Sequence, residues 1–275
     1  MAEEALQKAR EFEEKGLLDE AEKKYLEAVK EAEKEDGSAL GEVYLEVGLF
    51  YTRIGELEKS IEFYMKSLEV YERKGDEEGV ADAAYNLSVS YLELGEYDEA
   101  EKHCVKALEM YKKMGLREGV ADAMYALGLI SIGRTEIEKG IEKLQEALKI
   151  YSEEGNEDGM GSVLLDLGEA YYRLEELDKA IEHYQSAVKI LEKSGDKLTS
   201  AYAIKRIGDS YSDKGDMRRM LDNYLKAAKI YIEEGDQEAA QDIIDEIEDR
   251  FWDLPKATRR TVSKKLDELR ALMKK

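Results

Sequence analysis

The sequence predicts an all-α protein built from stacked pairs of antiparallel helices. The chain has one proline among 275 residues, and proline is the residue that most strongly breaks helix interiors. No segment shows the alternation of apolar and polar residues that is typical of a strand. Similar segments also recur every 40 residues, and self-similarity at such a period indicates a repeat architecture.

Five segments align at this period. They read FYTRIGELEKSIEFYMKSLEVY from residue 50, SYLELGEYDEAEKHCVKALEMY from 90, ISIGRTEIEKGIEKLQEALKIY from 130, AYYRLEELDKAIEHYQSAVKIL from 170 and SYSDKGDMRRMLDNYLKAAKIY from 210. With a less regular first copy, they predict six repeats within residues 1–240, at about 2–40, 41–80, 81–120, 121–160, 161–200 and 201–240.

Each copy carries small residues at fixed positions. On the first helix they are Gly48, Ser88, Gly128, Gly168 and Gly208; on the second they are Ser60, Ala100, Gly140 and Ala180, followed by Ser67, Ala107, Ala147, Ala187 and Ala227. A spacing of seven is about two helical turns, so these residues share one face. Small faces let two helix backbones approach closely, and tyrosines such as Tyr51 and Tyr171 fill the space beside them. The pattern predicts core packing between antiparallel helices.

Glycines and capping residues separate the helices. Gly16, Gly55, Gly95 and Gly215 fall between the two helices of a copy, whereas Gly75, Gly115, Gly155, Gly195 and Gly235 close the second helix, followed in four cases by the capping residues Asp76, Asn156, Asp196 and Asp236. Two copies have Thr135 and Glu175 in place of the glycine between helices. A left-handed backbone costs a non-glycine residue on the order of 1 kcal/mol, so we expect these two turns to be reshaped.

The run LGEAY at residues 167–171, followed by Ala180, Tyr184 and Ala187, resembles the tetratricopeptide repeat (TPR). That unit is a helix-turn-helix of about 34 residues with the same order of residue types. The longer period of 40 residues resembles the variant found in kinesin light chain and in G-protein regulatory adaptors. The resemblance covers about 240 of the 275 residues. It implies a right-handed superhelical solenoid of six TPR-like repeats.

Residues 241–275 leave the repeat pattern. Their apolar residues form two helical stripes, Ile243, Ile244, Ile247 and Phe251 before Pro255, and Val262, Leu266, Leu269 and Met273 after it. Terminal repeats need a polar outer face, so we expect capping helices here. Residues 256–275 hold eight Lys and Arg against two Asp and Glu, whereas the rest of the chain holds 34 against 62. Opposite charge blocks favour docking, which can occur within the chain, between protomers or with an acidic partner.

The composition disfavours several classes of function. A net charge of −22 disfavours binding to nucleic-acid phosphates, and no apolar run approaches the roughly 20 residues needed to cross a bilayer. The N-terminal residues are acidic and amphipathic, unlike a secretory signal, and one cysteine excludes an internal disulfide. We therefore expect a soluble cytoplasmic protein. Abundant Glu and Lys also match a thermophile bias, although helix propensity favours the same residues.

The residues that could carry chemistry have structural explanations. Cys104 takes the place that a tyrosine or leucine holds in the other copies, which predicts a buried, inert core cysteine. His103 and His183 hold one position in copies two repeats apart, too far apart to share a metal, so we expect both on the surface. No glycine motif of a nucleotide site follows a strand. The sequence thus predicts a non-catalytic protein without a metal or cofactor.

The TPR resemblance implies a concave groove lined by the first helix of each repeat. The positions that face ligands in the family correspond here to Tyr85, Asn86, Val89, Leu92, Tyr125, Leu129, Ile132, Tyr172, Arg173, Tyr202, Lys205 and Arg206, with Leu165 and Asp166 beside them. They form an aromatic and aliphatic stripe with a few cations, and exposed apolar patches often mark binding sites. The alternative is that these side chains pack against a neighbouring first helix or the tail.

The leading hypothesis is a non-catalytic scaffold that binds a peptide or partner helix in this groove, with Arg173, Lys205 and Arg206 orienting a carboxylate-bearing ligand. One alternative is a self-assembling protein in which the basic C-terminal helix docks on another protomer. A second alternative is a sensor for a small signalling peptide, as some bacterial TPR regulators are. Only Asn86 matches the residues with which chaperone-binding members hold a two-carboxylate ligand, so a chaperone tail is not expected.

Overall fold

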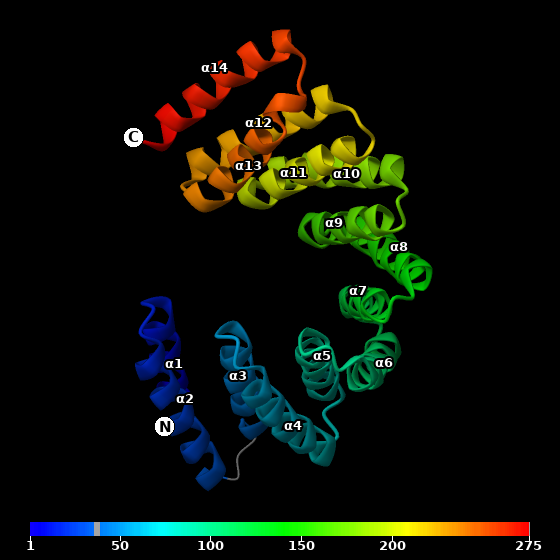
Figure 1. The fold of residues 1–275 in the computed structure, drawn as a ribbon. Helices are drawn as coiled ribbons and strands as arrows, with labels where there is room; N and C mark the ends of the chain where they lie inside the picture. The colour runs from blue at the N-terminus through cyan, green and yellow to red at the C-terminus, as the bar shows by residue number, and fades with distance from the viewer. Residues whose placement is uncertain (36–38, 275) are drawn as a thin grey trace. The chain divides into compact units, whose positions relative to one another are not determined.

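The computed structural model describes residues 1–35 and 39–274, and within them it contains fourteen α-helices, one short 3₁₀ helix and no strand (Figure 1). The helices are α1 (Ala2–Glu14), α2 (Leu18–Glu35), α3 (Leu40–Arg53), α4 (Leu57–Lys74), α5 (Glu77–Glu93), α6 (Tyr97–Met114), α7 (Arg117–Gly133), α8 (Ile137–Glu154), α9 (Glu157–Arg173), α10 (Leu177–Ser194), α11 (Lys197–Asp213), α12 (Met217–Glu234), α13 (Gln237–Asp249), η1 (Phe251–Asp253) and α14 (Lys256–Met273). The all-α prediction is therefore confirmed. None of the helices in these two ranges is long and apolar enough to cross a bilayer.

The chain divides into two compact units, Met1–Lys143 and Leu144–Lys275. In the first unit α1 packs on α2, α3 on α4 and α5 on α6, and each pair also contacts the next helix along the chain. The second unit repeats this order with α9 on α10 and α11 on α12, followed by α13 and α14 against α12. This consecutive packing of helix pairs confirms the predicted fold class of stacked pairs. The repeat spans stay a prediction, and α5 and α7 begin at Glu77 and Arg117, before the copy starts of 81 and 121.

Glycines of the first helices face tyrosines of the second helices. A Cβ atom added to Gly168 would lie 2.5 Å from a ring carbon of Tyr184, and one added to Gly208 would lie 2.4 Å from Tyr224. Both tyrosines are almost completely buried. Carbon atoms in contact are normally about 3.5–4.0 Å apart, so these rings occupy the space that a side chain would need. The predicted packing of small residues against aromatic ones is confirmed.

The helix ends follow the sequence signals, with one exception. The Asp76 carboxylate accepts a hydrogen bond from the backbone N–H of Gly79 at 3.1 Å, and the glycines at the helix ends have positive φ. Thr135 and Glu175 nevertheless adopt φ values of 67° and 59°, so the expectation that their turns are reshaped is wrong. The physical reason is that the backbone bonds around the turn are kept: the N–H of Glu176 donates to the Tyr171 carbonyl at 3.0 Å.

The C-terminal stripes differ from the prediction at one residue. Ile243, Ile244 and Ile247 are buried on α13, but Phe251 lies beyond the helix in η1 and is only half-buried. The prediction that Phe251 continues the stripe is therefore wrong, because the helix ends at Asp249. Pro255 directly precedes α14, whose residues Val262, Leu266 and Leu269 are buried while Met273 is half-buried.

Candidate functional site

The structure distributes the predicted groove residues over two faces, one in each unit. The α5–α7 face consists of Tyr85, Asn86, Val89, Leu92, Tyr125, Leu129 and Ile132, and the α9–α11 face consists of Leu165, Asp166, Tyr172, Arg173, Tyr202, Lys205 and Arg206. Helices α5 and α7 contact each other, and hydrogen bonds connect α9 to α11. The residues of each face are therefore brought together by packing between successive first helices.

All seven side chains of the α5–α7 face are half-buried, so each one both packs against its neighbours and reaches solvent. Burial raises the pKa of the Tyr85 hydroxyl, which therefore stays protonated at neutral pH. The Asn86 side-chain amide donates to the carbonyl of Asp82 in its own helix at 2.8 Å. This face is thus an aromatic and aliphatic stripe with one amide held against its own backbone.

Two cations of the α9–α11 face, Lys205 and Arg206, are paired with carboxylates of the same unit. The Arg206 guanidinium lies between Glu169 and Asp209. Its Nη2 donates a hydrogen bond to Glu169 and its Nη1 donates one to Asp209, each with a length of 2.7 Å. Lys205 forms ion pairs with Asp209 at 3.2 Å and with Glu246 of α13 at 3.0 Å. Arg206 and Asp209 are largely inaccessible, with side-chain exposures of 17% and 10%, so solvent screens this pair far less than a surface pair.

Two tyrosines continue this network. The Tyr202 hydroxyl donates to Glu169 Oε1 at 3.1 Å, and the Tyr172 hydroxyl donates to the Asp213 carboxylate. The guanidinium carbon of Arg206 lies 4.3 Å from the centre of the Tyr172 ring, within the range of a cation–π interaction. Burial and the neighbouring carboxylates raise the pKa of Tyr172 and of Tyr202 to about 12. Both phenols therefore act as neutral donors.

Sequence reasoning missed the acidic members of this network. They are Glu169, Asp209, Asp213 and Glu246, which lie on α9, α11 and α13. Asp209 follows Lys205 and Arg206 at spacings of four and three residues, a separation at which side chains meet on a helix. That signal was present in the sequence, whereas the contact of Arg206 with Glu169, 37 residues away, required the packing of α9 on α11.

Cys104 is completely buried, as predicted. Its thiol donates to the carbonyl of Ala123 at 3.3 Å, and burial raises its pKa to about 12. Since the thiolate is the nucleophilic form, burial disfavours reaction of this cysteine in the folded chain.

We expect native Cys104 to react with a disulfide reagent such as DTNB at least about 100-fold more slowly than the unfolded chain, because a thiol with a raised pKa holds little thiolate. The release of the coloured leaving group at about pH 8, followed with and without urea, measures both rates. Equal rates before and after unfolding would show that the thiol is accessible and ionised.

The expectation that both histidines lie on the surface is wrong. His103 stacks on Tyr91 with ring centres 5.8 Å apart, and His183 stacks on Tyr171 at 5.2 Å. Both are half-buried, and burial lowers their pKa. In each pair the tyrosine, from α5 or α9, covers one side of the histidine ring. Over residues 1–35 and 39–274, no three His, Cys, Asp or Glu side chains are grouped so that they could hold a metal ion.

Stacked helix pairs with an apolar stripe along the first helices define a helical-repeat protein, a class whose folds present extended binding surfaces. A family model of the tetratricopeptide repeat matches residues 39–113 and 118–193, more than half of the chain. The chain belongs to the tetratricopeptide repeat family. A second model, of the soluble NSF attachment protein (SNAP), matches residues 162–249.

Solved structures share the fold at low sequence identity. The apo form of RapI aligns with a TM-score of 0.68 and 15% identity, over 97% of this chain and 99% of RapI. A Rap protein complexed with Competence and Sporulation Factor aligns with a TM-score of 0.65 and 14% identity, over 96% of this chain and 75% of the Rap chain. BtubC (BKLC) from P. vanneervenii aligns with a TM-score of 0.63 and 21% identity, over 83% of this chain and 87% of BtubC. No curated protein sequence matches the chain.

Proposed function

We propose that the protein is a non-catalytic scaffold that binds a peptide or a helix of a partner protein along its first helices. The observation that carries the proposal is the α5–α7 face, on which seven mainly aromatic and aliphatic side chains are only half-buried. Partly exposed apolar stripes of this kind often mark binding sites, and helix-in-groove recognition uses such stripes. A cytoplasmic location belongs to the same proposal, and the single unpaired Cys104 supports it.

The α9–α11 face contributes orientation in this proposal. Lys205 and Arg206 already form ion pairs with Glu169, Asp209 and Glu246. A carboxylate of the ligand therefore gains these cations only by replacing one of the internal carboxylates. Such an exchange favours ligands whose carboxylate is fixed in position, because a flexible one loses more side-chain entropy on binding.

The test is a double substitution, Tyr125→Ala with Leu129→Ala, in the α5–α7 face. Peptides are first selected on the full chain from a displayed random library, and their Kd values are then measured by fluorescence polarisation. We expect the variant to bind at least about tenfold more weakly, because removing central aromatic and aliphatic anchors typically costs 1–2 kcal/mol or more.

Val105→Ala is the matched control, since Val105 is an exposed apolar residue of α6 and is not part of the α5–α7 face. Its Kd values should equal those of the unchanged chain. If the double variant also keeps its affinity for every selected peptide, the face is packing surface rather than a binding site.

A sensor of a small signalling ligand is the second candidate. The likeness to RapI extends over nearly the full length of both chains, and a Rap protein of the same fold was solved with Competence and Sporulation Factor. In this case selected peptides would be short, and binding would change the spacing between helices, which small-angle X-ray scattering measures. Self-assembly through the C-terminal helices is the remaining alternative.

A further inference from the structure

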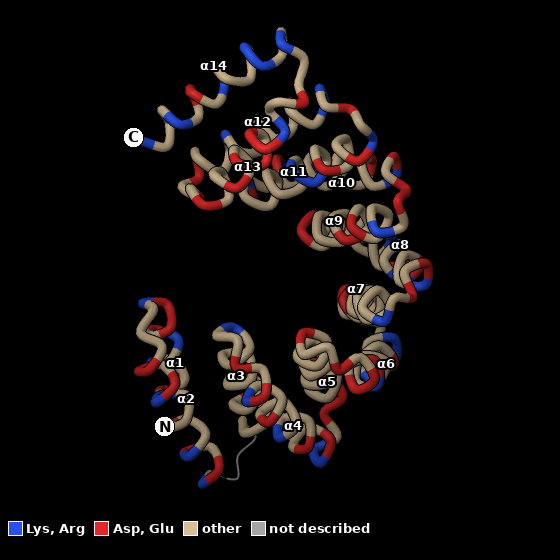
Figure 2. The backbone as a smooth tube through the Cα atoms, in the orientation of Figure 1, with Lys and Arg blue, Asp and Glu red and all other residues tan. Residues whose placement is uncertain are grey.

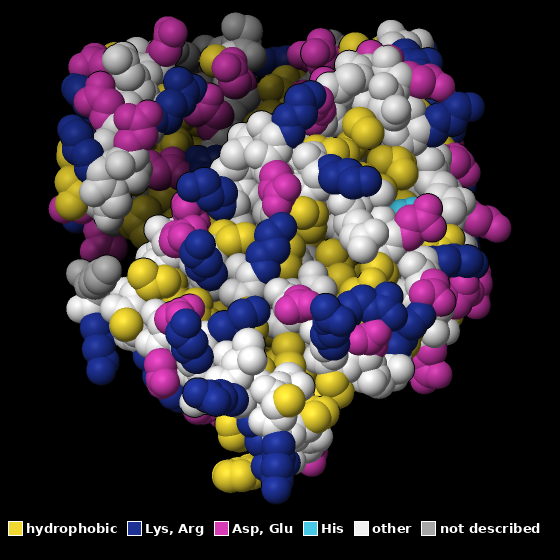
Figure 3. All heavy atoms as spheres, turned by 90° about the horizontal axis from the view of Figure 1, so that it is seen from above, with side chains coloured by type: hydrophobic (Ala, Val, Ile, Leu, Met, Phe, Trp, Pro, Cys, Tyr) yellow, Lys and Arg dark blue, Asp and Glu magenta, His cyan; other side chains and the backbone are white. Residues whose placement is uncertain are grey.

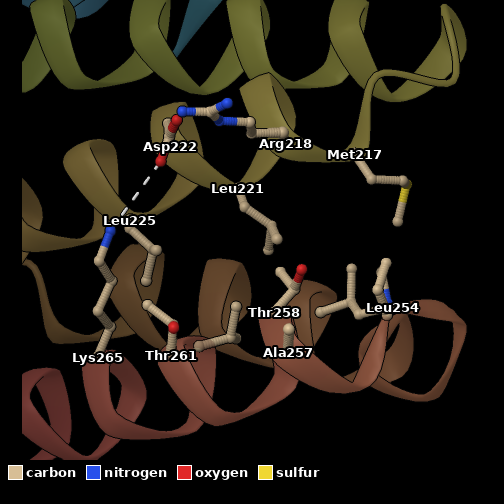
Figure 4. A pocket seen from close by; sticks show the side chains of 12 residues that line it. Met217, Arg218, Leu221, Asp222, Leu225, Leu254, Ala257, Thr258, Thr261 and Lys265 are labelled. Carbon is tan, nitrogen blue, oxygen red and sulfur yellow. Dashed lines mark ion pairs between the residues drawn. The ribbon is translucent and has the colours of Figure 1, made fainter.

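Helices α12 and α14 border an open cavity of about 440 Å³ in the C-terminal unit (Figure 4). Leu221 and Leu225 project into it from α12, and Leu254 closes one end (Figure 4). The opposite wall is formed by the small side chains Ala257 and Thr261 of α14. We call this cavity the α12–α14 groove. Its volume lies within the roughly 300–1,000 Å³ that is typical of ligand sites.

The groove exists because α14 covers α12 only in part. The buried residues Val262, Leu266 and Leu269 hold α14 in place, whereas Ala257 and Thr261 are exposed in its first turns. These two side chains are too short to fill the space opposite Leu221 and Leu225. The result is an open recess whose floor is formed by Leu221 and Leu225, which are almost completely buried, and whose rim carries the exposed Ala257 and Thr261.

The groove has the shape of a helix-binding site. On α12 its lining residues Met217, Leu221 and Leu225 are spaced four apart, and on α14 Ala257, Thr261 and Lys265 have the same spacing. Residues four apart lie on one face of a helix, so the groove runs along both helices for about two turns. An amphipathic partner helix, with apolar residues at the same spacing, fits between two such stripes.

The charge of this surface selects an acidic occupant. Residues 256–274 contain seven Lys and Arg against two Asp and Glu, and Figure 2 shows them along α14. At the mouth of the groove Arg218 and Lys265 face a single carboxylate, Asp222, which is 4.0 Å from the Lys265 amine. Figure 3, seen from the side of α14, shows Lys and Arg side chains spread over this face, with apolar and acidic ones between them.

We propose that the α12–α14 groove binds an amphipathic helix with acidic flanks from a partner protein. Its aliphatic side chains would enter the recess above Leu221 and Leu225, and its carboxylates would meet Arg218 and Lys265. Residues 1–255, with 34 Lys and Arg against 62 Asp and Glu, repel such a helix, so electrostatic steering directs it to α14.

The test uses the full chain and a fluorescein-labelled synthetic helix of Leu, Ala and Glu, with Leu at every third or fourth position. We expect a Kd on the order of 10 µM, rising at least about tenfold in Thr261→Trp, whose indole fills the groove from an exposed position. Arg218→Glu with Lys265→Glu should weaken binding by at least the same factor. Lys149→Glu with Lys189→Glu is the control for net charge, since both lysines are exposed on α8 and α10, and it should bind as the unchanged chain does.

Three results would overturn the proposal. If a version of the probe with Lys in place of Glu binds equally well, or if Thr261→Trp binds like the unchanged chain, the groove is not the acidic-helix site. If instead the probe fails to bind and light scattering shows a dimer that Thr261→Trp dissociates, the occupant is a second copy of this chain. Tyr125→Ala with Leu129→Ala should leave probe binding unchanged, which separates this site from the α5–α7 face.

Discussion

Replacing Gly168 with Val is expected to lower the free energy of unfolding by about 2 kcal/mol or more, because forcing extra atoms into a packed core typically costs 1–3 kcal/mol. A Cβ at this position lies 2.5 Å from the Tyr184 ring, and Tyr184 is completely buried, so it has no open space to move into. The better helix propensity of valine offsets only about 0.5 kcal/mol of this cost. Urea unfolding followed by circular dichroism measures the difference.

Two further variants identify the cause. Ser162→Val changes an exposed position of the same helix α9 and should shift the free energy of unfolding by no more than about 0.5 kcal/mol. Combining Gly168→Val with Tyr184→Ala should cost less than the sum of the two single changes, since the clash disappears with the ring. If the effects of Gly168→Val and Ser162→Val are equal, or if the double variant is additive, the close contact does not set the stability.

Replacing Arg206 with Met is expected to lower the free energy of unfolding by about 3 kcal/mol, the cost of breaking a buried ion pair by removing one partner. The guanidinium is the shared partner of Glu169 and Asp209, and its side chain is 17% exposed. Methionine keeps much of the packing volume but leaves Glu169 without a cation, while Asp209 keeps only Lys205. The same urea titration, carried out at neutral pH, gives the size of the loss.

Lys226→Met is the matched control, because Lys226 pairs with Glu192 at 3.1 Å while both side chains are about half exposed. An exposed pair contributes about 0–1 kcal/mol, so this variant should stay close to the unchanged chain. Adding Glu169→Gln to Arg206→Met should restore part of the stability, since one unpaired charge is removed. No recovery, or an equal loss in Lys226→Met, would contradict the role given to this network.

The fold could be predicted from the sequence because its packing repeats with the sequence. Glycines at a fixed position of the first helices face a bulky partner, as Gly168 faces Tyr184 and Gly208 faces Tyr224. The turns at Thr135 and Glu175 could not be predicted in the same way. Their geometry is set by the helices on either side, whereas propensity describes only the residue itself.

The sequence predicts on which helices the candidate-site residues lie, but it does not predict all of the ion pairs that they form. The repeat period places Tyr85, Tyr125, Leu165 and Lys205 at equivalent positions of their helices, whereas nothing in the period tells that Glu169, among 64 acidic residues, pairs with Arg206. That choice depends on how α11 packs on α9. The α12–α14 groove was also not predictable, because the two apolar stripes around Pro255 were visible but the direction of α14 after the proline was not.

The left-handed turns at Thr135 and Glu175 have a consequence for how repeats of this kind diverge. Each turn keeps its path although the residue that favours that path has been lost, at a strain of about 1 kcal/mol. Packing between helices thus tolerates mutation at the turn, and turn residues can drift while helix faces stay constrained. Repeat copies are therefore aligned more reliably by their small and aromatic helix positions than by the glycines that separate the helices.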